Sequence, residues 1–438
     1  MRDFLPDDVR RRAHVIAIIA KVYERYGFEP LETPAVENIE TLLGKYGDEG
    51  NQLIFKILKR GEHEASGQAD LALRYDLTVP LARVVAQYQS QLPRLFKRYQ
   101  IQPVWRADRP ARGRFREFYQ CDVDALGSTS PVVEAELCAA VSDALIDLGF
   151  DDFEVRINHR QLLTSVLSQA GVAPERHAEA LVALDKLDKI GVAGVSAEFA
   201  QRNIPAAAGE QLLHLFGAGR QIAGARGFLD AIAEVVQDEA GRQAVENLTA
   251  ILALTSGTGA EGKVRFDPSL ARGLSYYTGA IMEINVTDLA GSLGGGGRYD
   301  NLVGMFLGQN IPACGFSLGL ERILVVMGER KMFPPALDGA PADVMLATFD
   351  ASGIGAAMRL AVALRRSGLR VLVYPDAEKI GKQIKYADSR GIPFVGLLGA
   401  NEIAAGAVTV KNLATQAQAT YDQSAAGAAI LEGLRQRG

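Results

Sequence analysis

Apolar residues recur at helical spacing near the start of the chain, and this pattern predicts an amphipathic helix. A proline and an aspartate stand just before the pattern and Gly27 follows it, which are typical start and stop signals. The face expected to be buried repeats at i, i+4, i+7, i+11 and i+14, and it consists of Val9, Ala13, Ile16, Ala20 and Tyr23.

The pattern then changes to that of strands. Residues 71–76 form a short strand-like run that ends at Asp76, and this aspartate can cap a helix beginning near Thr78. Residues 95–105 are expected to be extended, residues 108–113 to turn, and residues 115–126 to form a second strand. Together these segments predict a long antiparallel hairpin.

Polar and apolar residues alternate along the second strand of this hairpin. Because side chains alternate between the two faces of a strand, one face is apolar and the other is polar. One interpretation of the polar face is a solvated sheet surface, which is normal for antiparallel sheets. The other is a binding surface, since cation, aromatic ring, amide and carboxylate follow one another beside a basic turn. The polar face consists of Arg114, Arg116, Phe118, Gln120, Asp122 and Asp124.

The middle of the chain is rich in alanine and leucine at helical spacing, and we expect a helical insertion at about 165–258. Strand patterns resume at Val264 and lead to a loop that contains four glycines, residues 294–297. This glycine run predicts either a flexible hairpin end or a backbone that approaches a ligand closely. A strand at 313–318 then leads into a helix whose first turn carries Arg322.

Three prolines within residues 331–341 indicate a linker. Strands and helices alternate after it, which predicts a compact α/β domain at 341–438. The overall expectation is an α/β protein with an α+β core, an antiparallel sheet flanked by helices, in a first domain at 1–335. Lysines on the second helix of the later domain are either solvated surface or phosphate contacts, and they are Lys379, Lys382 and Lys385.

Charge is unevenly distributed along the chain. The formal net charge is -5, but residues 1–340 carry -8 and residues 341–438 carry +3. Eight lysines and arginines lie between Arg94 and Arg116, against a single acidic residue. This distribution is typical of a protein that binds a polyanion at chosen places rather than one that coats nucleic acid.

The sequence gives no sign of a membrane segment, a targeting signal or a disulfide framework. No stretch of 18 apolar residues occurs, so we expect no membrane role and a cytoplasmic location. Three scattered cysteines are too few for a disulfide framework or a zinc knuckle.

Arginines from distant parts of the chain are the main candidates for chemistry. Arg106 and Arg322 can clamp the two ends of a triphosphate while Phe118 stacks on an adenine ring. Arg272 adds a permanent positive charge that can stabilise charge developing on a phosphate. The five histidines are scattered, and His159 is interpreted as structural, so a histidine-based mechanism is disfavoured.

Several of these segments resemble the sequence motifs of a known protein family. The chain resembles the histidine-specific class II aminoacyl-tRNA synthetases over nearly its whole length. Residues 106–124 resemble motif 2 of that class, residues 315–322 resemble motif 3, and residues 271–277 with 296–300 resemble the histidine-specific elements. Residues 375–376 and 381–388 are similar to the anticodon-binding module of the family.

The resemblance implies roles for individual residues. Arg106 is expected at the α-phosphate of ATP, Arg322 at the γ-phosphate and Phe118 on the adenine, with Arg114 also at the nucleotide. Arg272 is expected to take the catalytic role often given to a metal ion. The implied histidine contacts are Asp76, Leu77, Thr78, Gln120, Asp124, Tyr276 and Tyr277.

The chemistry of imidazole supports these assignments. A neutral imidazole has one donor and one acceptor, so Asp124 can accept from one ring nitrogen while a tyrosine hydroxyl donates to the other. One residue departs from the family pattern, because Ser275 stands where an aspartate is common.

The implied reaction joins L-histidine to its tRNA through a histidyl-adenylate, with ATP as substrate and Mg²⁺ bridging its phosphates. The resemblance also implies a homodimer. The main alternative is a histidine-sensing paralogue without catalysis, of the kind that regulates ATP phosphoribosyltransferase, but such proteins usually lack the second domain. A further alternative is a tRNA-sensing module of a larger protein.

Overall fold

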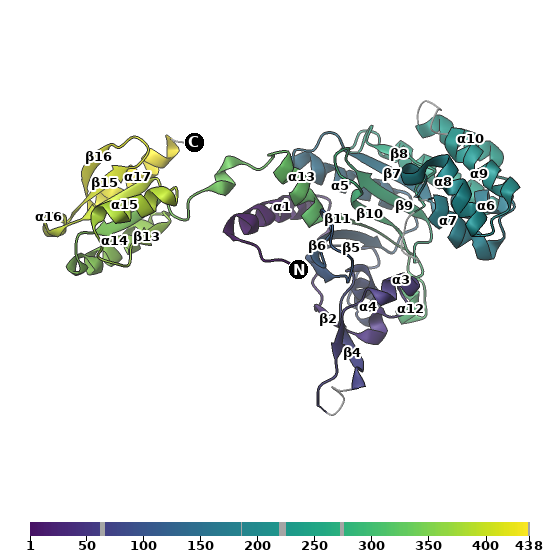
Figure 1. Cartoon of the computed structure of the whole chain (residues 1–438), viewed down its shortest axis with the longest axis horizontal. Helices are drawn as coiled ribbons and strands as arrows, with labels where there is room; N and C mark the ends of the chain where they lie inside the picture. Colours follow the sequence, from purple (N-terminus) through teal and green to yellow (C-terminus); the bar gives the residue numbers. More distant parts are fainter. Residues whose placement is uncertain (62–65, 185, 219–224, 272–275, 437–438) are drawn as a thin grey trace. The chain divides into compact units, whose positions relative to one another are not determined.

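The computed structural model describes residues 1–61, 66–184, 186–218, 225–271 and 276–436. The chain divides into two compact units, Met1–Phe333 and Pro334–Gly438, and each has hydrophobic clusters of its own (Figure 1). The mixed α/β architecture, with a large antiparallel sheet followed by a smaller α/β unit, confirms the fold class expected from the sequence.

A large sheet forms the centre of the first unit. Within the described residues it has eight strands in the order β1-β5-β6-β11-β10-β9-β7-β8, and its central strands pair antiparallel. The expected hairpin is present as β5 and β6, which pair over their whole length from Phe96↔Leu126 to Trp105↔Glu117. The strands of this sheet are β1 Glu29–Pro30, β5 Phe96–Trp105, β6 Glu117–Leu126, β7 Glu154–His159, β8 Val264–Phe266, β9 Ala280–Asn285, β10 Ser292–Arg298 and β11 Ala313–Gly319.

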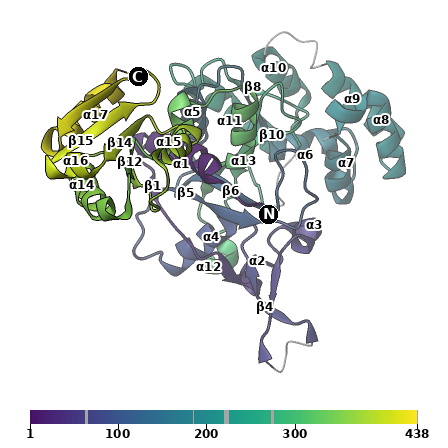
Figure 2. The same ribbon diagram turned by 60° about the vertical axis from the view of Figure 1, so that its left-hand side comes forward.

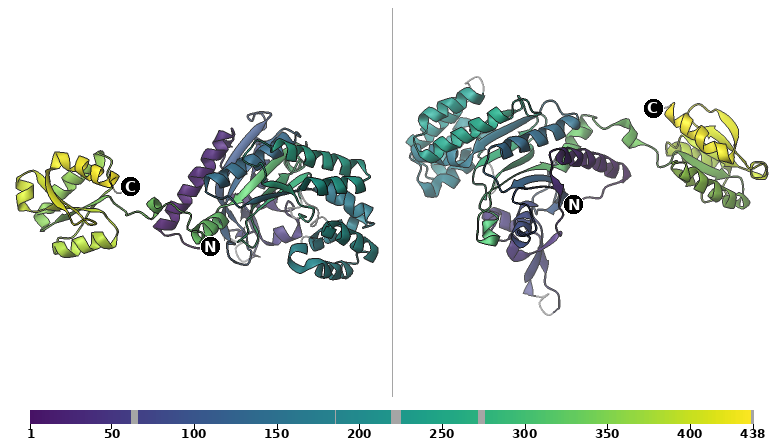
Figure 3. Two further views of the ribbon diagram at one scale, coloured as in Figure 1. Left: turned by 90° about the horizontal axis from the view of Figure 1, so that it is seen from above. Right: turned by 180° about the vertical axis from the view of Figure 1, so that it is seen from behind.

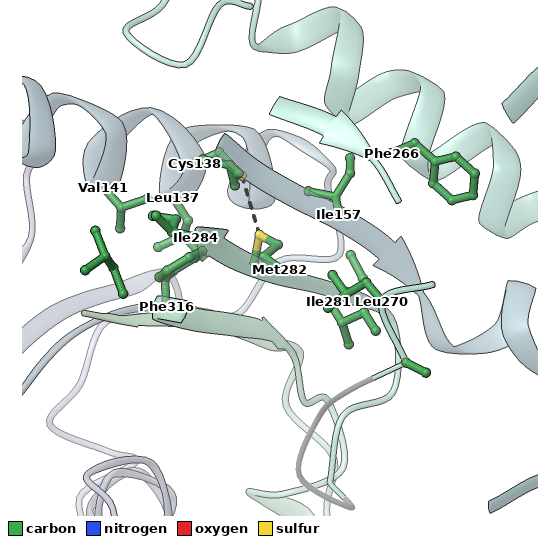
Figure 4. Packing of buried hydrophobic residues seen from close by; sticks show 14 of the residues in the cluster. Leu137, Cys138, Val141, Ile157, Phe266, Leu270, Ile281, Met282, Ile284 and Phe316 are labelled. Carbon is green, nitrogen blue, oxygen red and sulfur yellow. Dashed lines mark hydrogen bonds between the residues drawn. The ribbon is translucent and has the colours of Figure 1, made fainter. Parts of the chain in front are cut away.

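Long helices pack on the apolar face of this sheet. The helices are α1 Pro6–Arg25, α5 Val132–Asp147 and α13 Leu320–Glu329, and they contact one another and strands β5, β6 and β11. Figure 4 shows the packing of α5 on the sheet, where Cys138 Sγ lies 3.5 Å from Met282 Sδ. All three cysteines are buried and free, as expected for small hydrophobic residues.

The buried stripe of α1 differs from the one predicted. Val9 and Ala13 are exposed, and the helix instead buries Val15, Ile19 and Val22 together with Tyr23. Both stripes have helical spacing, so periodicity predicted the helix correctly but could not decide which face meets the sheet.

A second, smaller group of elements packs against the large sheet where Phe96, Leu126 and Ala313 lie. It contains a three-stranded sheet in the order β2-β4-β3, which extends away from the large sheet in Figure 2. Its buried residues form a cluster that includes Tyr46, Tyr75, Tyr276 and Tyr299. The elements of this group are β2 Val36–Asn38, α2 Ile39–Leu42, α3 Gly47–Gln52, β3 Lys56–Leu58, β4 Ala69–Leu73, α4 Thr78–Gln87 and α12 Gly304–Leu307.

The alanine-rich middle of the chain is helical, as its spacing predicted. Helices α6 and α11 contact each other and strand β7, which attaches this region to the large sheet. The helices are α6 Arg160–Gln169, α7 His177–Leu184, α8 Leu187–Gln201, α9 Ala206–Ala218, α10 Ala225–Val235 and α11 Glu239–Leu254.

The four consecutive glycines lie in a strand, and the prediction of a loop was wrong. They form the middle of β10, between β9 and β11. A Cβ at Gly296 would lie 2.1 Å from the backbone oxygen of Gly315, and one at Gly294 would lie 2.3 Å from that of Ser317. The glycines are therefore explained by the close approach of two central strands.

The second unit is a five-stranded sheet in the order β13-β12-β14-β15-β16. Helix α15 packs on one face through Ala387, while α14 and α17 pack on the other through Leu360 and Ile430. Figure 3 shows helices on both faces of this sheet. The last strand and helix were not predicted from the sequence. The elements are β12 Val344–Thr348, α14 Ile354–Arg366, β13 Val371–Val373, α15 Ile380–Ser389, β14 Phe394–Leu398, α16 Ala400–Ala404, β15 Ala407–Asn412, β16 Gln418–Asp422 and α17 Gln423–Arg435.

In the part of the chain that the structure describes, no helix combines the length and apolar character needed to span a bilayer.

Candidate active site

The polar face of β6 is buried where it crosses the middle of the large sheet. Gln120, Asp122 and Asp124 are each less than a tenth exposed, so the interpretation of this part of the face as solvated surface was wrong. Gln120 Nε2 donates to Ser317 Oγ at 2.8 Å. Burial raises the pKa of Asp122 to about 7, and it also raises the pKa of Asp124. Buried carboxylates of this kind are unusual unless they have partners.

Asp124 has two such partners. The guanidinium of Arg98 lies with Nη2 2.8 Å from Asp124 Oδ2, and the hydroxyl of Tyr299 donates to Asp124 Oδ1. Arg98 stands directly opposite Asp124 in the β5–β6 ladder, and its side chain is 0% exposed. Its Nη2 also lies 3.9 Å from Asp122 Oδ2. Two neighbouring carboxylates thus share one buried cation.

Asp76 occupies the start of α4, where the sequence placed a helix cap. Its Oδ1 accepts from the backbone N–H of Val79 at 3.1 Å and from the hydroxyl of Tyr46 at 2.9 Å. Its Oδ2 accepts from the hydroxyl of Tyr276 at 3.3 Å. Burial raises the pKa of Asp76, although these hydrogen bonds and the charge of Arg106 act in the opposite direction.

The tyrosines expected to contact histidine lie beside this aspartate. The rings of Tyr276 and Tyr277 meet edge to face with centroids 5.1 Å apart, and Tyr276 meets Tyr299 in the same way at 6.0 Å. Thr78 forms a side-chain hydrogen bond with Tyr276, whose pKa is raised mainly by burial. Leu77 lies just before α4 and is fully buried. Tyr276 therefore links the Asp76 segment to the Tyr299–Asp124 pair.

Arg106 and Phe118 lie together at the turn end of the hairpin. The Cζ atom of Arg106 is 5.2 Å from the centroid of the Phe118 ring and 4.3 Å from that of Tyr75. Arg106 Nε also donates to the carbonyl of Tyr75 at 3.0 Å. Because Tyr75 precedes Asp76, the guanidinium of Arg106 is held next to the carboxylate cluster.

Arg322 lies in the first turn of α13, close to the hairpin turn. A Cβ added at Gly113 would lie 3.2 Å from Arg322 Cγ, so the turn approaches this arginine closely. Arg322 Nη1 donates to the backbone carbonyl of Ser292. The preceding residue, Glu321, accepts from the backbone N–H of Tyr119 at 2.8 Å and so anchors the start of α13 against β6.

The remaining predicted residues are not part of this contact network. Arg114 is half exposed in the hairpin turn, with its Nε 3.8 Å from Asp108 Oδ2. Arg272 and Ser275 lie outside the described residues. The segment just before them is anchored, because Asn158 Nδ2 donates to the carbonyls of Pro268 and Leu270 at 3.1 and 2.9 Å.

Sequence reasoning missed several residues of the cluster, above all Arg98 and the aromatic residues around Asp76. Arg98 was counted only as one charge of a basic stretch. A usable signal was present in the sequence, because polar residues alternate along β5 as they do along β6. In the β5–β6 ladder these residues face one another as Arg98↔Asp124, Gln100↔Asp122 and Gln102↔Gln120. Two facing strands with polar residues in register indicate a shared polar surface.

Among the residues that the structure describes, no group of three or more histidine, cysteine, aspartate or glutamate side chains could hold a metal ion. His159 caps α6, where its Nδ1 accepts from the backbone N–H of Gln161 at 3.2 Å. Burial and the charge of Arg298 lower the pKa of His159 to about 4.

The fold and the buried polar cluster together define an α/β protein in which buried carboxylates lie beside the fixed cations of Arg98 and Arg106. Comparison with known proteins is more specific. Residues 1–323 match the model of the family described as histidyl-tRNA synthetase, and residues 343–432 match the anticodon-binding domain. The chain belongs to the histidyl-tRNA synthetase family, whose members are aminoacyl-tRNA ligases.

Individual relatives are similar to this chain over nearly its full length. A histidine–tRNA ligase of Gloeobacter violaceus is 41% identical over 99% of this chain and 98% of its own length. Another, from Phocaeicola vulgatus, is 40% identical over 95% and 94%. The solved histidyl-tRNA synthetase of Nostoc sp. PCC 7120 is 29% identical with a TM-score of 0.79, covering 98% of this chain and 97% of that one.

Proposed function

We propose that this protein joins L-histidine to tRNA(His) in two steps, with ATP as the energy source and histidyl-adenylate as the intermediate. The observation that supports this best is the proximity of two groups of residues. Arg106, expected at the phosphates, donates to the carbonyl of Tyr75, while the adjacent Asp76 belongs to the cluster expected to bind histidine. A bound amino acid and a bound α-phosphate would therefore be neighbours.

In this proposal the two ends of histidine meet different polar groups. Its ammonium group needs acceptors, and Asp76 and Gln120 supply them. Gln120 Oε1 is buried and has no hydrogen-bond partner in the described part of the protein, which suits an incoming donor. The imidazole is assigned to Asp124 and to a hydroxyl of the Tyr276–Tyr277 pair, and Leu77 and Thr78 complete the contact.

ATP is assigned to the hairpin and the start of α13. Phe118 would stack on adenine, Arg106 would contact the α-phosphate, and Arg322 would contact the γ-phosphate with Arg114 nearby. Mg²⁺ would enter as part of the Mg·ATP substrate. The backbone of Arg322 lies in a helix first turn, which adds a favourable dipole for an anion.

The first step needs no general base, because the carboxylate of histidine is already ionised. One of its oxygens attacks the α-phosphorus, the bond to the β-phosphate oxygen breaks, and pyrophosphate leaves. Arginines can only stabilise the charge of this transition state, and Arg106 and Arg272 are assigned that role. In the second step a terminal ribose hydroxyl of tRNA attacks the acyl carbon and AMP leaves.

The remaining proposals concern partners. The anticodon-binding match of residues 343–432 supports a tRNA contact by the second unit. A homodimer is proposed from the family resemblance, and the cytoplasmic location expected from the sequence remains a proposal. A solved Bacillus halodurans protein, described as an ATP phosphoribosyltransferase regulatory subunit/histidyl-tRNA synthetase, is only 23% identical to this chain, so its structural similarity shows the fold alone. The full-length ligase relatives favour catalysis over regulation.

Histidine-dependent exchange of pyrophosphate into ATP tests this proposal. The wild-type protein should catalyse exchange with histidine and not with other amino acids. A regulatory paralogue would bind histidine without any exchange, and that result would overturn the proposal.

Replacement of Arg272 by alanine tests its assigned role. We expect the exchange rate to fall about 10²–10³-fold, because one fixed charge at the transition state is lost. Histidine binding, measured by calorimetry, should be largely retained. Exchange at the wild-type rate would show that Arg272 is not catalytic.

A further inference from the structure

The carboxylate of Asp124, which is expected to accept a hydrogen bond from the imidazole, has neighbours on three sides. On the β5 side, Arg98 Nη2 contacts Asp124 Oδ2 at 2.8 Å. On the other oxygen, the hydroxyl of Tyr299 donates to Oδ1. On the β11 side stands Gly315, where an added Cβ would lie 1.9 Å from the same Oδ1. The carboxylate is thus confined by neighbours on three sides.

The guanidinium of Arg98 also reaches the other part of the proposed histidine site. Its Nη2 lies 3.4 Å from the backbone carbonyl of Leu77, between Asp76 and Thr78. One cation therefore joins the segment assigned to the amino-acid end of the substrate to the carboxylate assigned to its ring. These groups come from three parts of the chain, the residue before α4 and the strands β5 and β6, which only the tertiary fold brings together.

The two buried carboxylates of this cluster need a nearby cation to remain ionised. Asp122 and Asp124 point from the same face of β6, and both are 2% exposed. Two carboxylates this close and this buried favour uptake of a proton, which would remove acceptor capacity from one of them. Arg98 is permanently charged and lies within 4 Å of both.

We propose that Arg98 is a positioning residue for the choice of histidine, which fixes the Asp124 carboxylate as an acceptor for the imidazole N–H and sets its distance from Leu77. Tyr299 serves the same end by holding the second oxygen. This inference rests on the proposed ligase function. A merely structural ion pair would affect stability without affecting the discrimination between amino acids.

The test measures discrimination in the pyrophosphate exchange reaction. The two substrates are histidine and β-(2-thienyl)alanine, whose five-membered ring has no N–H. The variants are Arg98→Lys, which keeps the charge but loses the planar guanidinium, and Tyr299→Phe, which removes one hydroxyl. Arg83→Lys is the matched control, because Arg83 also pairs with a buried carboxylate, that of Glu37 at 2.7 and 2.9 Å, outside the cluster.

We expect the ratio of kcat/KM for histidine to that for the analogue to fall about tenfold or more in Arg98→Lys, since the site loses a fixed acceptor. The KM for histidine should rise while the KM for ATP stays constant. Tyr299→Phe should lower the ratio in the same direction, and Arg83→Lys should leave it unchanged.

An unchanged ratio in folded Arg98→Lys would overturn the inference. If that variant does not fold, as judged by circular dichroism and size-exclusion chromatography, Tyr299→Phe decides, and a wild-type ratio there is the contrary result. Failure of the proposed function would look different, because the wild-type protein itself would then show no exchange with histidine.

Discussion

At the scale of single residues, burial is the main determinant of chemistry in this protein. Asp76, Asp122 and Asp124 are ordinary aspartates in the sequence, yet burial raises the pKa of each. His159 shows the opposite shift, because a buried imidazole resists the charged form. The interpretation of His159 as structural fits its place as the cap of α6.

His159 makes stability depend on pH in a predictable direction. Its pKa is about 4 in the folded protein and about 6.5 when unfolded, so the unfolded chain binds the proton more readily. Stability from this residue is present above pH 6.5 and is lost as the pH falls toward 4. We expect a loss of about 2 kcal/mol between pH 7.5 and 5.

His159→Asn provides the measurement. Asparagine is also a good helix cap but does not titrate. In urea unfolding of the first unit, the variant should lose less stability than wild type between those two pH values. Equal losses would show that His159 does not contribute.

At the scale of elements, close strand contact explains the glycine run. Four glycines in β10 let it approach β11 on one side and β9 on the other. The same approach places Gly315, and hence Asp124, in the middle of the sheet. Strand β10, whose glycines do not indicate a strand in the sequence, therefore supports the strands that carry the candidate site.

Two alanine substitutions in β10 should differ in severity. A Cβ at Gly296 would meet the Gly315 oxygen at 2.1 Å, whereas one at Gly295 would have only the Met282 oxygen at 3.1 Å nearby. We expect Gly296→Ala to lower stability by about 1–3 kcal/mol or more through overpacking and to reduce exchange activity. Gly295→Ala should have the smaller effect on both. Thermal unfolding and exchange assays measure this order, and equal effects would contradict the explanation.

At the scale of the whole molecule, the chain combines an acidic first unit with a mildly basic second one. Helix α15 covers one face of the second sheet and carries exposed Lys382 and Lys385, with exposed Lys379 just before its start. On the proposed function, these cations would contact tRNA phosphates.

Replacement of all three lysines by alanine should separate the two reaction steps. Pyrophosphate exchange, which needs no tRNA, should be unchanged. The KM for tRNA in aminoacylation should rise roughly tenfold, and its dependence on salt should weaken. Arg359→Ala with Arg366→Ala, on helix α14 across the sheet, is the control and should leave this KM near its wild-type value. A triple variant with normal tRNA kinetics would exclude α15 as the contact.

The sequence by itself determined the β5–β6 hairpin, the helical middle of the chain, most of the alternation in the second unit and the motifs that indicated the family. These features depend on local spacing, so residues such as Asp76, Phe118 and Arg322 could be chosen without a structure. Tertiary structure decided which face of α1 is buried, why the glycines stand in a strand, and that the polar face of β6 lies inside. It also showed the pairing of Arg98 with Asp124. Such contacts depend on which strands become neighbours, and that is set by the packing of segments far apart in the chain.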